Sequence, residues 1–273
     1  MTISVLGCGW LGFPLAQKLM SEGFNLKGST TSEKKFKEIK NSGIEPYLLS
    51  LPDQIEDSSS KSFWDADILF LNIPPQRGSD SVEKDYPDLI KIITQKAKSE
   101  DIKWIIFASS TSVYSSEGGV THENEAKMGN ASRPSGEAVL AAEEVLKNSG
   151  MDSTIIRFGG LYGYGRHPVK YLAGKKDLSG ASKPVNLIHQ TDCLNIIHEV
   201  IKQDKKNEVY NAVSDGHPPR KEFYKSAAQH FNLTEPGFSS ENGDKQYRVI
   251  SNNKLKHELG YTFSYPNPMD HTP

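Results

Sequence analysis

Short apolar runs alternate with amphipathic helical patterns over the first 160 residues of the chain. The runs are continuous in apolar character, which is typical of strands buried on both faces of a parallel sheet. The segments between them repeat apolar positions at helical spacing, as crossover helices do. Strands are expected at residues 3–6, 24–28, 47–51, 68–73, 104–108 and 154–158, and helices at 13–20, 32–43, 86–98 and 136–148. This alternation predicts an α/β fold with a doubly wound parallel sheet.

The pattern changes in the last third of the chain. Glycine, tyrosine, lysine and proline crowd residues 159–184, which predicts turns and irregular backbone. Further strands are expected at residues 185–188 and 209–212, and further helices at 192–203, 219–231 and 253–259. Residues 57–62 are polar and serine-rich, so a loop is expected there. We therefore expect a smaller C-terminal lobe beside the main sheet.

Composition and charge exclude several classes of partner. The chain has 273 residues with 32 Lys and Arg, 34 Asp and Glu, and a formal charge of -2. This balance argues against a nucleic-acid or anionic-membrane surface, and no apolar run reaches the ~20 residues that a membrane span needs. The two cysteines and eight histidines show no spacing typical of a metal site. We expect a cytoplasmic protein with no metal, nucleic-acid or membrane partner.

A glycine-rich loop joins the first expected strand to the first expected helix. Gly7, Gly9 and Gly12 fit the pattern G-x-G-x-x-G, with Trp10 and Leu11 between the second and third glycines. In this context the first glycine allows a tight turn, the second lets the backbone approach a pyrophosphate, and the third lets the helix pack on the strand. Free N–H groups at the helix start attract the same anion. The loop predicts a dinucleotide-binding domain over residues 1–160.

The end of the second strand indicates which dinucleotide is bound. An NAD site usually has Asp or Glu at this point to hold the ribose 2'-hydroxyl. Here the strand leads into Ser29, Thr30 and Thr31, with Lys34 following. Hydroxyl groups and a lysine suit a 2'-phosphate, because they donate hydrogen bonds to an anion. We therefore expect NADP as the cofactor, with NAD as the alternative.

Several segments resemble the extended short-chain dehydrogenases/reductases, the group that includes nucleotide-sugar epimerases and dehydratases. Residues 107–114 (FASSTSVY) resemble the family's fifth strand, and residues 156–163 (IRFGGLYG) its sixth strand and the loop beside the nicotinamide. Residues 186–192 (NLIHQTD), 209–212 (VYNA) and 255–260 are similar to its later segments. The resemblance spans nearly the whole chain and implies an NAD(P)-dependent, epimerase- or dehydratase-like protein.

The family's catalytic pair is missing at the matching positions. Ser110 stands where the family has the hydroxyl that polarises the substrate oxygen. The family's catalytic Tyr and Lys are replaced by Ser135 and Val139. That Tyr transfers protons because the neighbouring Lys lowers its pKa from ~10 toward neutrality. A serine without a nearby cation cannot do the same, so we expect the inherited proton-transfer route to be lost.

The resemblance also implies which other side chains border the cleft. Tyr162 lies in the loop beside the nicotinamide, where it could replace the missing proton donor; the alternative is a packed aromatic side chain. His189 is either a substrate contact or a hydrogen-bonded structural residue. The remaining expected contacts are Ile73, Pro74, Ser109 and Gly159 for the cofactor, and Thr111, Tyr164 and Arg166 for the substrate.

Two functions remain open. The first is an NADP-dependent oxidoreductase or epimerase/dehydratase-like enzyme acting on a small molecule, such as a nucleotide sugar or a small carbonyl compound. The second is a non-catalytic NADP-binding sensor or scaffold. Residues 161–273 form mainly the substrate lobe in either case, with residues 185–212 returning to the main sheet. The resemblance further implies a homodimer formed through the helices at 86–98 and 136–148.

Overall fold

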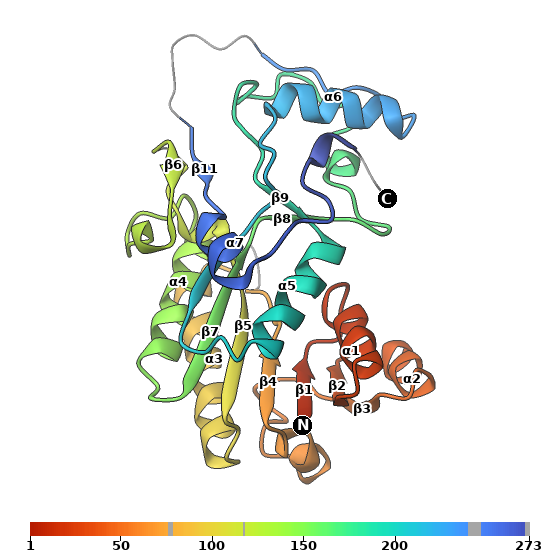
Figure 1. The fold of residues 1–273 in the computed structure, drawn as a ribbon, viewed down its shortest axis with the longest axis vertical. Helices are drawn as coiled ribbons and strands as arrows, with labels where there is room; N and C mark the ends of the chain where they lie inside the picture. Colours follow the sequence, from red (N-terminus) through yellow and green to blue (C-terminus); the bar gives the residue numbers. More distant parts are fainter. Residues whose placement is uncertain (76–78, 117, 240–246, 271–273) are drawn as a thin grey trace.

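A parallel sheet forms the centre of the computed structural model, which describes residues 1–75, 79–116, 118–239 and 247–270. Seven strands pair in the order β10-β7-β5-β4-β1-β2-β3, and every pairing is parallel (Figure 1). The strands are β1 (Thr2–Leu6), β2 (Asn25–Thr30), β3 (Glu45–Leu48), β4 (Ile68–Leu71), β5 (Trp104–Ser110), β7 (Asp152–Phe158) and β10 (Val209–Ala212). The expected doubly wound α/β fold is confirmed.

Helices cover both faces of this sheet. Successive side chains of a strand point to opposite faces, so Phe70 of β4 joins one apolar cluster while Leu69 and Leu71 join the other. The first cluster lies under α1 (Gly12–Ser21), α2 (Glu33–Asn41), α5 (Gln190–Lys202) and α7 (Asn253–Leu259). The second lies under α3 (Val82–Ser99) and α4 (Pro134–Lys147). In the described residues, no helix combines the length and apolar character that crossing a membrane requires.

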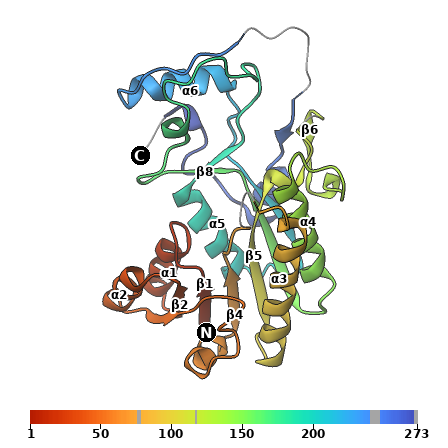
Figure 2. The ribbon, with the colours of Figure 1, turned by 180° about the vertical axis from the view of Figure 1, so that it is seen from behind.

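A smaller lobe lies beyond the carboxyl ends of the strands, as both views show (Figures 1 and 2). It contains β8 (Gly160–Tyr162) paired with β9 (Leu187–His189), and the helix α6 (Arg220–His230). A second short pair, β6 (Val120–Thr121) with β11 (Val249–Ile250), lies near α4. The short 3-10 turns are η1 (Ser58–Trp64), η2 (Thr111–Val113), η3 (Glu123–Glu125), η4 (Pro168–Tyr171) and η5 (Pro268–Asp270).

One local expectation was wrong, and a second was shifted in its bounds. The polar segment at residues 57–62 is not a simple loop, because η1 covers most of it and continues to the fully buried Trp64. The Ser60 hydroxyl donates to the Asp57 carbonyl at 2.8 Å, so the polar side chain satisfies the backbone inside the turn. The strand expected at residues 185–188 lies at Leu187–His189 and pairs with β8 rather than with the central sheet.

A buried ion pair joins the sheet to α4. Arg157 of β7 and Glu143 of α4 are at most 1% exposed, and their closest atoms are 2.6 Å apart. Arg157 also donates to the Tyr114 hydroxyl at 2.7 Å, and that hydroxyl donates to Asn211 of β10. Burial alone would lower the pKa of Arg157, but the hydrogen bonds and charge of Glu143 outweigh it and raise the pKa. Arg157 therefore stays charged in the core.

Candidate cofactor and substrate site

The glycine loop between β1 and α1 has the geometry that each glycine's expected role requires. Gly7 has φ +102°, which favours glycine. A Cβ atom on Gly12 would lie 2.2 Å from the Gly7 carbonyl oxygen, so the helix can approach the strand only without a side chain there. A Cβ on Gly9 would meet nothing within 4 Å. The backbone is thus tightly packed at Gly7 and Gly12 and open at Gly9.

The start of α1 can receive an anion. The N-cap residue, Leu11, makes no side-chain hydrogen bond to this helix end, and the first turn contains no acidic residue. The first N–H groups of a helix lack intrahelical partners and carry partial positive charge. Gly9, which has open space where a Cβ would stand, lies three residues before the first residue of α1. This arrangement fits the pyrophosphate of a dinucleotide.

Asn72 supports the loop, and the sequence analysis missed it. Its Nδ2 atom donates to the Gly7 carbonyl oxygen at 2.9 Å. Its backbone carbonyl oxygen lies 2.6 Å from where a Cβ on Gly7 would stand. The sequence signal that could have identified Asn72 is its position, a polar amide directly after the apolar strand β4. Next to it, Ile73 is half-buried and accepts a hydrogen bond from the Tyr86 hydroxyl through its carbonyl, and Pro74 is exposed.

Cys8 fills the space between the loop and β2. Its Sγ lies 2.7 Å from where a Cβ on Gly28 would be, so β2 has a glycine at this point because the thiol packs there. The side chain is 2% exposed, and burial raises the pKa of its thiol to about 12. A position near a helix start often lowers a thiol pKa, but burial dominates here. Cys8 is therefore an unreactive packing residue.

The residues expected around the ribose divide into one buried support and three accessible groups. Ser29 is 2% exposed, and its hydroxyl accepts a hydrogen bond from the Gly7 N–H at 3.0 Å. Its side chain thus holds the glycine loop from beneath. Thr30 is half-exposed, and Thr31 and Lys34 are exposed at the carboxyl end of β2. These three remain available to a ligand in solvent.

At the end of β5, two neighbouring serines face different surroundings. The Ser109 hydroxyl is buried and donates to Glu143 at 2.6 Å, so it belongs to the polar network in the core. Ser110 is half-exposed, and its hydroxyl accepts a hydrogen bond from the Ser112 N–H at 3.1 Å. That bond leaves the Ser110 O–H free to rotate toward a ligand. Thr111 is 6% exposed and begins η2.

The start of α4 lies directly against η2. A Cβ on Gly136 would come within 2.3 Å of the Ser112 carbonyl oxygen, which explains the glycine. Ser135 is half-buried beside it. Val139 is 4% exposed and packs in the apolar cluster under α3 and α4. The position that the resemblance matches to the family's catalytic lysine is therefore an apolar contact.

The loop after β7 places its aromatic residues in different ways. Tyr162 is fully buried with Phe223 in the lobe's apolar cluster, and its hydroxyl has no hydrogen-bond partner in the described part of the chain. Burial raises the pKa of Tyr162, and the charge of Asp192 adds to the effect. Gly159 is buried, and a Cβ there would lie 2.8 Å from the Asn186 carbonyl oxygen. Tyr164 is 55% exposed.

His189 is a buried residue at the junction of β9 and α5. Its Nδ1 accepts a hydrogen bond from the Thr191 N–H at 3.2 Å, and its ring lies 3.7 Å from the Tyr265 ring between centroids. A Cβ on Gly163 would lie 2.9 Å from its Nε2 atom. Three residues later, Asp192 accepts from the Tyr261 hydroxyl at 2.7 Å and so fixes the C-terminal segment to α5.

Trp10 connects the glycine loop to the lobe. Its indole N–H donates to the Tyr164 carbonyl at 2.9 Å, and its own carbonyl accepts from Gln190 Nε2 at 2.5 Å. The Arg166 guanidinium lies 5.1 Å from the centre of the indole ring, within cation–π range. Leu11, in contrast, is 4% exposed and packs in the core. Tyr164 and Arg166 are thereby held next to the predicted cofactor site.

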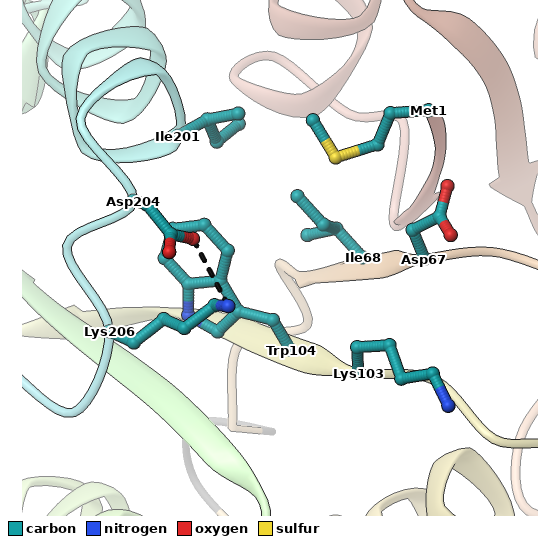
Figure 3. Close-up of a pocket in the computed structure, with 8 residues that line it drawn as sticks. All are labelled: Met1, Asp67, Ile68, Lys103, Trp104, Ile201, Asp204 and Lys206. Atoms are coloured by element: carbon teal, nitrogen blue, oxygen red, sulfur yellow. Dashed lines mark ion pairs between the residues drawn. The ribbon is translucent and has the colours of Figure 1, made fainter.

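Two cavities lie away from this site. One, of about 320 Å³, is at the amino ends of the strands, where Met1, Asp67 and Lys103 precede β1, β4 and β5 (Figure 3). The other, of about 410 Å³, lies between α5 and the residues that follow α7. No predicted site residue lines either cavity. Open α/β sheets bind their ligands at the carboxyl ends of the strands. The end of the sheet that carries the glycine loop is therefore the better candidate for the binding site.

The fold and the loop geometry define a Rossmann-type dinucleotide-binding protein. Residues 7–190 match the family model described as NAD(P)H-binding, and the chain belongs to this family. It is 33% identical over 270 residues to protein YeeZ of Escherichia coli (strain K12), covering 98% of this chain and 97% of that protein. The resemblance noted in the sequence is thus confirmed at the level of the NAD(P)-binding family.

Solved structures show the same fold. UDP-N-acetylglucosamine 4-epimerase from Bacillus cereus superposes with a TM-score of 0.78 at 18% identity, over 99% of this chain and 97% of that chain. A short-chain dehydrogenase/reductase superfamily protein from Agrobacterium tumefaciens, with bound NAD, has a TM-score of 0.76 at 15% identity, over 99% and 94%. At these identities the likeness concerns the fold and not the reaction.

Proposed function

We propose that the protein is an NADP-dependent oxidoreductase or epimerase/dehydratase-like enzyme that acts on a small molecule. The observation that carries the proposal is the glycine loop, which is open only at Gly9 and is followed by a helix start that its N-cap residue, Leu11, does not cap with its side chain. Gly7, Gly9 and Gly12, with the N–H groups of Trp10 and Leu11, hold the pyrophosphate. When bound, the nicotinamide supplies the hydride donor or acceptor.

The preference for NADP over NAD rests on the carboxyl end of β2. Thr30 and Thr31 are accessible there, and Lys34 is exposed in the first turn of α2; the nearby acid Glu33 begins α2 and does not end β2. The two threonines and the lysine donate hydrogen bonds or positive charge to a 2'-phosphate, whereas an NAD site would have a carboxylate for the 2'-hydroxyl. Ser29 contributes indirectly, because its hydroxyl accepts a hydrogen bond from the Gly7 N–H and so supports the glycine loop. Calorimetry with NADP and NAD tests the preference directly, and tighter binding of NAD would contradict it.

Ser110 is the polar group that we assign to the reacting oxygen of the substrate. Its hydroxyl is half-exposed at the end of β5, and η2 fixes its backbone. Tyr162 is a weaker choice for proton transfer, since it is fully buried and its pKa is raised rather than lowered. A water molecule bound near Ser110 is the better proton carrier. Thr111, Tyr164, Arg166 and His189 border the substrate in this proposal.

The substrate class that we propose is taken from the structural relatives. One is an epimerase of a nucleotide sugar, and another was solved with NAD. We propose a nucleotide sugar or a small carbonyl compound as substrate, and a homodimer formed through α3 and α4. Consumption of NADPH with a panel of both compound classes tests an oxidoreductase, because it changes the cofactor's redox state. Conversion of the compounds in the presence of NADP tests an epimerase or dehydratase, which regenerates its cofactor. Sedimentation velocity tests the dimer.

One observation favours a second candidate, a non-catalytic NADP-binding sensor or scaffold. Val139 is buried in an apolar cluster at the position of the family's catalytic lysine, so no cation can act on Ser135 from there. A sensor binds NADP without turnover and binds its partner with an affinity that depends on NADP. Detectable NADPH turnover, together with a pull-down unchanged by NADP, would reject the sensor.

A further inference from the structure

Gln190 is a buried polar side chain that reaches from the lobe to the glycine loop. It is the first residue of α5, directly after β9, and is 3% exposed. Its Nε2 atom donates to the Trp10 carbonyl oxygen at 2.5 Å, across 180 positions of sequence. Only the amide nitrogen of glutamine can make this contact, because the amide oxygen would repel a carbonyl oxygen. Chemistry therefore fixes the direction of this hydrogen bond.

The accepting carbonyl belongs to the peptide unit that joins Trp10 to Leu11. This unit is planar and trans, so its carbonyl oxygen and the Leu11 N–H point in opposite directions. Leu11 is the N-cap residue of α1, and the first N–H groups of a helix lack intrahelical partners. A donor on the carbonyl side also polarises the unit and strengthens its N–H as a donor. Gln190 is thus placed to aim and to strengthen the Leu11 N–H.

Trp10 is tied to the lobe a second time, through its side chain. The indole N–H donates to the Tyr164 carbonyl at 2.9 Å. The Arg166 guanidinium lies 5.1 Å from the centre of the indole ring. The main-chain tie and the side-chain ties of Trp10 therefore all lead to the lobe.

These ties come from one packed part of the lobe. Gly163 and Arg166 close a turn, because the N–H of each donates to the carbonyl of the other, at 2.9 and 2.7 Å. A Cβ on Gly163 would lie 2.9 Å from the Nε2 atom of His189, so this turn packs on the residue directly before Gln190. The lobe thus holds the Trp10–Leu11 peptide from two neighbouring points.

We propose that Gln190 is a positioning residue for the cofactor's pyrophosphate, acting through the Trp10–Leu11 peptide. The proposal rests on the proposed function, in which the N–H groups of Trp10 and Leu11 hold that pyrophosphate. Because the donor comes from the lobe, the bond also sets the distance between the bound cofactor and the substrate contacts Tyr164 and Arg166. Hydride transfer depends on such positioning of the two reactants.

A purely structural tie would behave differently. Loss of a hydrogen bond that only fastens α5 to the loop lowers the free energy of unfolding and leaves the ligand affinity of the folded protein unchanged. Loss of a bond that preorganises an anion-binding N–H weakens ligands that carry the pyrophosphate and spares ligands that lack it. The experiment therefore compares ligands with and without a pyrophosphate.

The test is calorimetric titration of the full chain with NADP, with NAD and with adenosine 2'-monophosphate, which has the 2'-phosphate but no pyrophosphate. Gln190→Glu keeps the length of the side chain and replaces the donor with an oxygen. We expect the Kd for NADP to rise by about tenfold or more at neutral pH, because a hydrogen bond is lost and a negative charge is added beside an anion site. The Kd for adenosine 2'-monophosphate should change by less than about twofold.

Lower pH should rescue the NADP affinity of Gln190→Glu. Burial raises the pKa of the introduced carboxyl above its usual value of ~4.3. Once protonated, this carboxyl donates to the Trp10 carbonyl, and the added charge is gone. The variant's Kd for NADP, divided by that of the unchanged protein, should therefore fall toward one as the pH is lowered from about 8 to about 5.5. Gln190→Met cannot donate at any pH, so its loss of about tenfold should not depend on pH.

Gln203→Glu is the matched control on the same helix. Gln203 also donates to a backbone carbonyl, that of Leu259 at 3.0 Å, but it follows the last residue of α5. The control should change the melting temperature at most and leave the Kd for NADP unchanged at every pH. Melting temperatures confirm that the variants compared are folded, and the uncharged Gln190→Met carries the test if Gln190→Glu does not fold.

The outcomes separate the role of Gln190 from the proposed function. Unchanged NADP affinity in the Gln190 variants overturns the role of Gln190 and leaves the proposed function standing. Equal losses for NADP and adenosine 2'-monophosphate, or an equal loss of NADP affinity in Gln203→Glu, also reject this role. Tighter binding of NAD than of NADP overturns the proposed cofactor alone, because both dinucleotides carry the same pyrophosphate and NAD then serves as the probe. An unchanged protein that binds neither dinucleotide overturns both.

Discussion

Replacing Gly9 with alanine separates cofactor binding from stability. A Cβ at this position meets no atom within 4 Å, and the backbone of Gly9 is not in the left-handed region. The substitution should therefore fold normally, and the lower entropy of the unfolded chain would raise the free energy of unfolding by up to ~1 kcal/mol. The same methyl group stands where the pyrophosphate approaches the backbone.

The expected loss of NADP affinity follows from the hydrogen bonds that the methyl group displaces. A hydrogen bond to a charged group contributes ~1.5–3 kcal/mol. Loss of one such bond raises the Kd for NADP by about 10- to 150-fold, since each 1.4 kcal/mol is a factor of about ten. Adenosine lacks phosphates, so its binding should change little and serves as the control ligand.

Gly12→Ala is the matched variant with the opposite effect. Its Cβ would lie 2.2 Å from the Gly7 carbonyl oxygen and 3.1 Å from Asn72 Nδ2, so backbone must move. Overpacking of this kind costs ~1–3 kcal/mol, and the bond from Asn72 to Gly7 contributes about 1 kcal/mol more if it breaks. Gly12→Ala should therefore lose stability in urea unfolding without cofactor, whereas Gly9→Ala should not.

Two results would refute this reasoning. If calorimetry gives Gly9→Ala the same NADP affinity as the unchanged protein, the pyrophosphate does not lie over Gly9. If urea unfolding shows that Gly9→Ala is as destabilised as Gly12→Ala, the space above Gly9 is not free.

Three further predictions concern the ribose, the core and the thiol. Thr30→Asp should weaken NADP more than NAD, because a carboxylate at the end of β2 repels the 2'-phosphate; equal losses for both cofactors in calorimetry would misplace the ribose. Glu143→Gln should lower the free energy of unfolding by about 3–5 kcal/mol, because it leaves Arg157 buried without its counter-ion. Glu144→Gln on the same helix is the control and should change the free energy of unfolding by less than ~1 kcal/mol. Similar values for both variants would show that the ion pair is not desolvated. Cys8 should resist iodoacetamide in the native protein from pH 7 to pH 9. Its pKa is raised to about 12, so the reactive thiolate appears only as the pH rises toward that value. Rapid modification of native Cys8 in this pH range, detected by mass spectrometry, would contradict its burial.

The sheet and the glycine loop were predictable because their signals are local. Continuous apolar runs marked six strands of the central sheet, and β10 was expected from its own short run. The spacing of Gly7, Gly9 and Gly12 is a property of one turn of backbone, so its geometry follows from the sequence directly. The loop expected at residues 57–62 was wrong because the buried Ser60 hydroxyl donates to the Asp57 carbonyl inside the turn, and the turn continues to the buried Phe63 and Trp64.

The directions of individual side chains depended on long-range contacts. Ser29, Thr30 and Thr31 are alike in the sequence, but pleating turns Ser29 under Gly7 and leaves its neighbours accessible. Ser109 and Ser110 point to opposite faces of β5 in the same way, and Ser109 is the one on the face where Glu143 accepts its hydrogen bond.

The sequence by itself determined the class of fold and the glycine loop of the NAD(P)-binding family, and it predicted that Ser135 and Val139 replace the family's catalytic Tyr and Lys. Only the tertiary structure decided that Tyr162 is buried and that Trp10 joins the loop to Arg166. The physical reason is that strands and turns follow from neighbours along the chain, whereas burial, charge and pKa follow from neighbours in space.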